Sequence, residues 1–138
     1  MTDLSRFIAA QAGTYDAALE EVRRGRKTSH WMWFVFPQLR GLGRSETSIH
    51  YGIVDVGEAR AYLADPILGP RLRQIAAATL AAPAGRSAAE VFGSIDAMKL
   101  RSSMTLFSIV DPDEPVFRAV LDRFFDGTPD PQTLELLA

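Results

Sequence analysis

Apolar residues spaced three or four apart behind helix-start signals are the feature that most restricts the fold of this chain. The clearest case follows Pro115, which stands after Asp113 and Glu114 as a proline at the first helical position behind an acidic cap. Gly127 closes the segment. The apolar stripe between them consists of Val116, Phe117, Val120, Leu121 and Phe124. We predict that this stripe faces the core.

Further start signals and apolar spacing predict seven more helices. The signals are Asp55 with Glu58, Ser87 with Glu90, and Asp130 with Pro131, the first two spaced as capping boxes. The eight predicted helices cover residues 4–11, 15–24, 58–64, 70–81, 87–92, 95–110, 115–125 and 131–137. No Ser/Gly/Pro-rich linker divides the chain. We therefore predict a mainly α, compact helical fold with a single domain over residues 1–138.

The aromatic segment from Trp31 to Phe36 has no periodicity that distinguishes a strand from a helical turn. Six consecutive apolar residues suit either a short buried strand or a buried turn of helix. Its secondary structure therefore stays open at this point. We expect the segment to be central to the core, with both Trp31 and Trp33 mostly buried.

Composition and charge exclude several classes of protein. The chain has no cysteine, which excludes disulfides, thiolate zinc sites, iron–sulfur clusters and cysteine nucleophiles. Its formal net charge of −2 gives no general attraction to nucleic acid. The N-terminus lacks the apolar core of a signal peptide, and no apolar run approaches the roughly eighteen residues of a membrane span. We expect a cytoplasmic protein that binds neither nucleic acid nor membrane, with its oligomeric state left open.

The polar residues around the aromatic segment, between residues 25 and 48, form the first candidate site. Basic and polar groups precede the aromatic run, and polar groups and glycines follow it, so a buried anchor would fix both sets. Glycine backbone can approach a ligand closely, and a serine that caps a helix lies beside amides that attract anions. The alternative is an ordinary loop leading into a helix. The candidate ligand-binding residues here are Lys27, Trp31, Gln38, Arg40, Gly43 and Ser45.

His30 is a candidate general acid or base, because it follows Lys27 by three residues and precedes Trp31. The alternative is a satisfied boundary residue, which most single histidines beside aromatics are. The only other histidine is His50, and no metal-ligand spacing accompanies either residue. We predict no metal site and no cofactor.

The second candidate site lies on the helix predicted over residues 95–110. Asp96, Lys99 and Ser103 share one face of that helix, amid apolar residues on nearly every other side. A surface ion pair is the simple interpretation. A largely buried pair would be costly without a purpose, so we take Asp96 and Lys99 as candidate catalytic residues and Ser103 as a candidate ligand contact. Lys27 and Lys99 are the only two lysines among fifteen basic residues, and arginine cannot replace a titratable amine.

Long strings in the chain resemble the bacterial domain-of-unknown-function family 1810, whose members sometimes carry the misleading label calpastatin. The strings are RFIAAQ at 6–11, GRKTSHWMWFVFPQLRGLG at 25–43, YGIVDVGEARAYL at 51–63, LGPRL at 68–72, FGSIDAMKLRSSMTLF at 92–107 and the tail at 130–137. The resemblance spans nearly the whole chain. It implies a small helical stand-alone domain and carries over no catalytic role.

A more distant likeness is to small bacterial hydrolases that act on nicotinamide- or ADP-ribose-linked N-glycosides. It concerns the order of a Gly/Lys-containing first half, a tyrosine-led helix and a late Asp-x-x-Lys helix. The candidate residues also suit a small anionic, nucleotide-like metabolite, with aromatics to stack, basic groups for phosphate and an acid for an oxocarbenium-like centre. Hydrolysis of such an N-glycoside is one hypothesis. A non-catalytic module that binds a small molecule or a protein, and a purely architectural role, are the alternatives.

Overall fold

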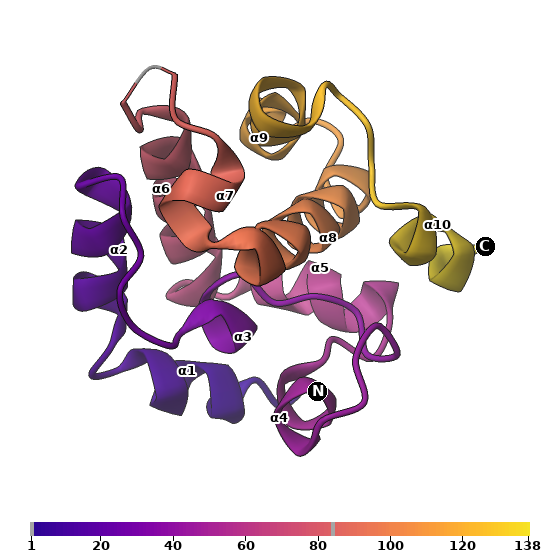
Figure 1. The fold of residues 1–138 in the computed structure, drawn as a ribbon. Helices are drawn as coiled ribbons and strands as arrows, with labels where there is room; N and C mark the ends of the chain where they lie inside the picture. The colour runs from indigo at the N-terminus through magenta and orange to yellow at the C-terminus, as the bar shows by residue number, and fades with distance from the viewer. Residues whose placement is uncertain (1, 84) are drawn as a thin grey trace.

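The computed structural model describes residues 2–83 and 85–138, and these ranges contain ten helices (Figure 1). They are α1 Ser5–Gln11, α2 Tyr15–Arg23, α3 Met32–Val35, α4 Glu46–Tyr51, α5 Val56–Ala64, α6 Leu68–Leu80, α7 Ala88–Phe92, α8 Ser94–Val110, α9 Pro115–Phe125 and α10 Pro131–Leu137. The prediction of a mainly α fold is confirmed. No helix in the described ranges is long and apolar enough to cross a membrane.

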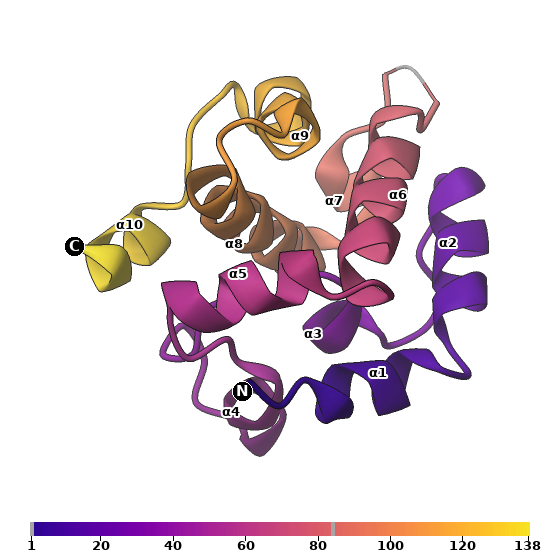
Figure 2. The same cartoon turned by 180° about the vertical axis from the view of Figure 1, so that it is seen from behind.

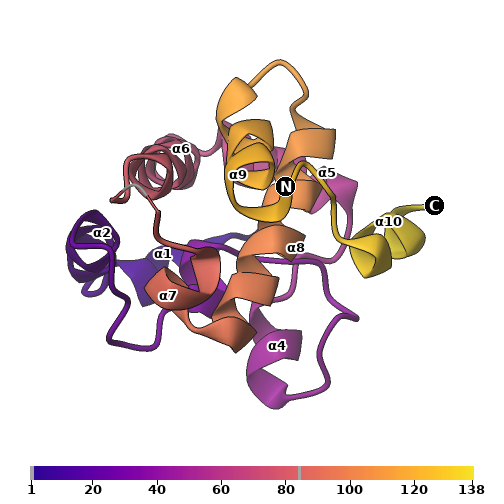
Figure 3. The same cartoon turned by 45° about the horizontal axis from the view of Figure 1, so that its top comes forward.

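The longest helix, α8, is the element around which the others pack. It contacts α3, α5, α7, α9 and α10, and Figures 1 and 2 show it crossing the middle of the molecule. Every residue from 102 to 107 is buried, so this helix is covered on all sides along that stretch. Figure 3 shows α2 and α10 on opposite sides of α8. The second candidate segment therefore forms the structural centre of the fold.

Helix positions agree with the spacing analysis, and the differences have local causes. The predictions for 115–125 and 131–137 match α9 and α10 at both ends, because a proline after an acidic cap fixes each start. Two helices were absent from the predicted set. Helix α4 has only six residues and α3 only four, which is too short for an apolar period to emerge. The open aromatic segment thus forms a single helical turn.

The two predicted capping boxes have different outcomes. At α7, the Ser87 side chain accepts from the Glu90 amide while the Glu90 side chain accepts from the Ser87 amide, so the box is complete. At α5, Asp55 accepts from the Glu58 amide at 2.8 Å, but the Glu58 carboxylate binds Arg6 at 2.8 Å. The Asp55 prediction was therefore right for the cap and wrong for the reciprocal half, and the helix begins at Val56.

The core contains a connected series of aromatic rings. Trp31 and Phe36 are fully buried and pack against Phe92, with ring centroids about 6 Å apart. Trp33 has intermediate exposure, so both tryptophans are mostly buried as expected, but Trp33 less completely than Trp31. The reason is the helical turn, because side chains rotate about 100° per residue and residues 31 and 33 cannot share a face.

A buried amide fixes the turn that carries Trp33. The Gln11 side chain, 1 % exposed, donates to the Phe34 carbonyl at 2.7 Å and to the Tyr62 hydroxyl at 3.0 Å. These bonds link α1, α3 and α5 across the core. The position of α3 is thus set by tertiary hydrogen bonds as well as by its own apolar residues.

Replacing Trp31 by alanine is expected to lower the free energy of unfolding by about 3–5 kcal/mol, since it removes a fully buried indole. Chemical denaturation measures this loss. The matched control is Trp33→Ala, whose partly exposed ring should cost less. Equal losses for the two variants would contradict the division of the segment into a core face and a solvent face.

Candidate functional site

The only two lysines of the chain meet at one carboxylate. Lys27 Nζ lies 2.8 Å from Asp96 Oδ2, and Lys99 Nζ lies 3.1 Å from Asp96 Oδ1. The Lys27 side chain comes from the loop after α2 and is 6 % exposed, whereas Asp96 and Lys99 stand in the first two turns of α8. The two candidate segments therefore meet, and we call these three residues the lysine–aspartate cluster.

Each lysine of this cluster also lies over a tryptophan. Lys99 Nζ is 3.8 Å from the ring centroid of Trp33, and Lys27 Nζ is 5.0 Å from that of Trp31. An ammonium over an indole face is attracted by the ring quadrupole. Lys27 Nζ also donates to the carbonyl of Ser29. With two ammonium groups on one carboxylate, the cluster carries a net positive charge in a partly buried place.

Asp96 remains ionised in this setting. Burial raises the pKa of its carboxyl, but hydrogen bonds and charges from Lys27 and Lys99 outweigh burial and hold the pKa below its ordinary value. A carboxylate with a lowered pKa is not a proton donor at neutral pH. Asp96 therefore serves here as the negative charge that holds the two ammonium groups.

A buried glutamate orders the loop that carries Lys27 and Trp31. Glu21, on α2, accepts from the amides of Thr28 at 2.7 Å and Ser29 at 2.9 Å, from the Ser29 hydroxyl at 2.5 Å and from Trp31 Nε1 at 3.0 Å. Burial raises the pKa of the Glu21 carboxyl. The four hydrogen bonds outweigh burial and lower that pKa from its ordinary 4.5 to about 2. Sequence reasoning missed this residue. Its only signal was a position three residues after buried Ala18, beside the apolar stripe of α2.

A cavity of about 180 Å³ opens beside the lysine–aspartate cluster. It lies between α3 with its following loop, the start of α8, and α10. Its walls are Trp33, Gln38, Leu42, Gly43, Ile95, Met98, Lys99, Ser102, Asp130 and Gln132. We call it the Trp33–Lys99 pocket. Asp130 and Gln132 come from the α10 region, which the sequence analysis had not linked to a site.

Several predicted site residues are at or beside this pocket. Gln38, Gly43 and Lys99 line it, while Lys27 and Asp96 form the charged cluster next to it. The role expected of Gly43 changes, however. A Cβ at this position would lie 2.9 Å from the Cβ of Ser48, so glycine is required here for packing against α4.

Besides Lys27 and Asp96, five more predicted residues are not on the pocket wall. His30 is exposed, and Arg40 donates to the Ile49 carbonyl at 3.0 Å and lines another cavity. Ser45 caps α4 through the Ser48 amide, and the buried Ser103 hydroxyl has no hydrogen-bond partner within the described residues. Trp31 lies under the cluster in the core. Lys27 and Lys99 thus meet at Asp96, and Lys99 shares the pocket wall with Gln38. His30 lies apart from them, because its loop is exposed.

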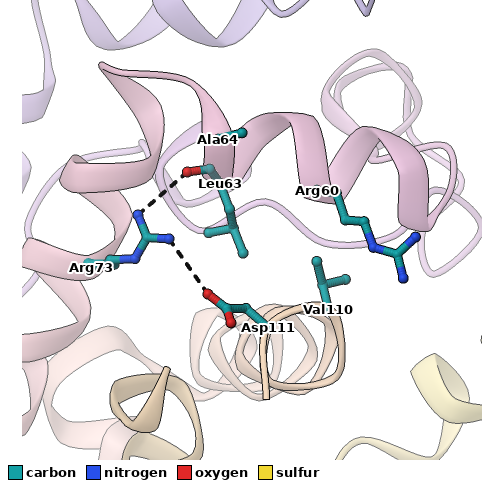
Figure 4. Close-up of a pocket in the computed structure, with 6 residues that line it drawn as sticks. All are labelled: Arg60, Leu63, Ala64, Arg73, Val110 and Asp111. Carbon is teal, nitrogen blue, oxygen red and sulfur yellow. Dashed lines mark hydrogen bonds and ion pairs between the residues drawn. The ribbon is translucent and has the colours of Figure 1, made fainter. Parts of the chain in front are cut away.

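Another cavity, of about 240 Å³, lies between α5, α6 and the end of α8 (Figure 4). It contains none of the predicted site residues. Its Arg73 is bound to Asp111 at 3.7 Å, to Glu114 at 3.2 Å and to the Leu63 carbonyl at 3.5 Å. Through these interactions Arg73 links α6 to α5 and to the segment between α8 and α9, so its role is structural. Elsewhere in the described ranges, no group of three His, Asp or Glu side chains is placed to hold a metal ion.

Removing the charge of Asp96 is expected to destabilise the protein by about 2 kcal/mol. Asp96→Asn leaves two partly buried ammonium groups without their carboxylate, and the loss is smaller than for a fully buried pair because water still reaches the cluster. In Asp96→Asn with Lys99→Met, part of that loss should return. Denaturation of the single and double variants measures this coupling. Simple additivity of the two substitutions would contradict the cluster.

Glu21 makes the stability of the fold depend on acid pH. Because its folded pKa is about 2 against an ordinary 4.5, its contribution of about 3 kcal/mol is complete above pH 4.5 and disappears as the pH falls toward 2. Urea denaturation from pH 7 to pH 2.5 should show this fall. In Glu21→Gln, stability should be lower at pH 7 and its dependence on acid shallower. Parallel curves for the two proteins would show that Glu21 is not the source.

Comparison with known proteins places this arrangement in a family. A family model described as a protein of unknown function, DUF1810, matches residues 1–137. The crystal structure of the conserved hypothetical protein Rv1873 from Mycobacterium tuberculosis is similar with a TM-score of 0.95 and 48% sequence identity, over 98% of this chain and 96% of that chain. No curated protein matches the chain. The resemblance inferred from the sequence is thereby confirmed, and the chain belongs to the DUF1810 family.

Proposed function

We propose that the protein binds a small ring-bearing metabolite with an anionic group in the Trp33–Lys99 pocket. One observation carries the proposal: Lys99, part of a cluster with net positive charge, lies on the pocket wall against the face of Trp33. An aromatic wall suits a flat ring, and an ammonium beside it suits a carboxylate or phosphate. Both features come from residues far apart in sequence.

The size of the pocket limits how much of a ligand it encloses. Sites for whole drug-sized ligands occupy about 300–1,000 Å³, whereas this cavity has about 180 Å³. It therefore fits one ring, such as a nucleobase or a nicotinamide, while the rest of a nucleotide-like ligand would extend into solvent. The side-chain amides of Gln38 and Gln132 on the wall supply donors and acceptors for the edge of such a ring.

Binding without catalysis is the function that this geometry supports best. Asp96, the candidate acid from the sequence, is occupied by two ammonium groups and is not among the residues that line the pocket. N-glycoside hydrolysis is a second candidate because Asp130 does line it. Asp130 Oδ2 accepts from Ser102, from the Thr133 amide and from the Thr133 hydroxyl. A carboxylate at this wall would stabilise an oxocarbenium-like centre.

The test is a binding screen with NAD, ADP-ribose, nucleoside monophosphates and simple carboxylates, followed by thermal shift and titration calorimetry at low salt. A ligand of this class should stabilise the protein, and Trp33→Ala and Lys99→Met should each weaken its affinity about tenfold or more. Arg60→Gln, which removes an exposed charge at the other cavity, is the control and should bind normally. Indifference to the whole panel, or equal affinity in all variants, would contradict the proposal.

Turnover separates the two candidate functions. Each ligand that binds is incubated with the protein, and released base or nicotinamide is measured by chromatography. If a product forms and Asp130→Asn abolishes it while affinity is retained, the protein is a hydrolase. If no product forms from a ligand that binds through Trp33 and Lys99, the binding module stands.

A further inference from the structure

A separate basic cleft lies on the α2 side of the molecule. It encloses about 440 Å³ and is lined by Arg24, Arg26, Thr28 and Arg86, all of them exposed. None of the ion pairs in the described part of the chain includes these arginines, and none of their guanidinium groups donates a hydrogen bond there. We call it the arginine cleft. Three unpaired arginines around one cavity are unusual in a chain of net charge −2.

The turn after α2 brings the two walls of this cleft together. Gly25 has φ +75°, and a Cβ at this position would lie 3.0 Å from Cδ of Pro83 and 3.5 Å from Cδ of Arg86. Only glycine combines that conformation with so close an approach. The stem of Arg86 is thereby held against the backbone between Arg24 and Arg26.

The loop that carries Arg86 is anchored from a third element. The guanidinium of Arg123, on α9, donates to the carbonyls of Leu80, of Ala82 at 2.9 Å and of Pro83 at 3.2 Å. These carbonyls lie at and just beyond the C-terminal end of α6, where a cation is favourable. Arg123 thus has a structural role, and its hydrogen bonds fix the wall on which Arg86 stands.

The opposite wall is fixed by hydrogen bonds of the segment from Arg26 to Ser29. The Lys27 amide donates to the Val91 carbonyl at 2.7 Å, and Glu21 accepts from the amides of Thr28 and Ser29. Arg26 and Thr28 line the cleft, while Lys27 between them turns to Asp96. The Thr28 hydroxyl makes no hydrogen bond within the described residues. The backbone of both walls of the cleft is therefore fixed, and the cleft presents three guanidinium groups and the Thr28 hydroxyl.

We propose that the arginine cleft binds a small anion with two or more phosphate groups. Planar guanidinium groups bind phosphate oxygens in bidentate fashion, and three of them exceed what one phosphate monoester needs. Glu21, three residues before Arg24, is bound to Thr28, Ser29 and Trp31, and Glu90, four residues after Arg86, is bound to the Ser87 amide at 2.8 Å. Neither makes an ion pair with these arginines within the described residues. The net negative charge of the chain disfavours a nucleic-acid backbone. This site does not depend on the function proposed for the Trp33–Lys99 pocket.

The experiment titrates the full chain with inorganic pyrophosphate, tripolyphosphate and orthophosphate, and with a short single-stranded RNA, by calorimetry at low and at physiological salt. Pyrophosphate or tripolyphosphate should bind more tightly than orthophosphate, and binding should weaken with salt. Arg24→Gln and Arg86→Gln should each reduce affinity about tenfold. Arg60→Gln, which removes the same charge from an exposed position on α5, should leave it unchanged.

Amide chemical shifts show where the probe binds. Perturbations at residues 24–28 and 85–87, with Lys99→Met behaving as the parent protein, would support the cleft. Arg86→Lys keeps the positive charge but replaces the planar guanidinium, which can bind a phosphate with two donors, by a single ammonium. This variant should therefore bind the probe with intermediate affinity. No binding at millimolar concentration, equal losses in Arg60→Gln and Arg86→Gln, or tighter binding of RNA than of tripolyphosphate would each overturn the proposal.

Discussion

The arrangement of the lysine–aspartate cluster and of the arginine cleft depends on the buried carboxylate of Glu21. It gathers two backbone amides, a hydroxyl and the Trp31 indole N–H from a segment that has no regular secondary structure of its own. A loop outside helices needs such a hydrogen-bond acceptor for its amides, because a buried amide without an acceptor lowers stability. Trp31 then inserts its ring into the core, and Lys27 is directed to Asp96. One acid on α2 thereby connects the core to the charged cluster.

The segment from Arg24 to Trp31 presents different residues on different sides. Lys27 and Trp31 face inward toward α8, while Arg26 and Thr28 face the arginine cleft. The inward cation Lys27 is paired and partly buried, whereas Arg24, Arg26 and Arg86 have no acid partner among the residues that the structure describes. This contrast follows from desolvation, since a buried ammonium without a carboxylate would be far more costly than an exposed guanidinium. Lysine also suits the inner positions because its charge is compact.

Helix α8 has two different roles along its length. Its buried stretch over residues 102–107, including Leu106 and Phe107, organises the packing of α5 and α9. Its first turns instead carry Asp96 and Lys99, with Ile95 and Met98 each 71% exposed on the pocket side. The charged cluster is thus built on the most firmly held element of the fold. Side chains fixed in this way keep a binding geometry without large rearrangement on binding.

The mainly α fold class and most helix positions could be predicted from the sequence, because capping and apolar spacing are local patterns. Pro115 and Pro131 fixed the starts of their helices, and the pairing of Asp96 with Lys99 followed from a three-residue step. The rarity of lysine singled out Lys27 and Lys99 as candidate site residues. The burial of Glu21, the contact of Lys27 with Asp96, and the separation of Arg40 and Ser103 from the pocket were decided by tertiary structure. Each depends on how helices distant in sequence pack, which no local pattern encodes.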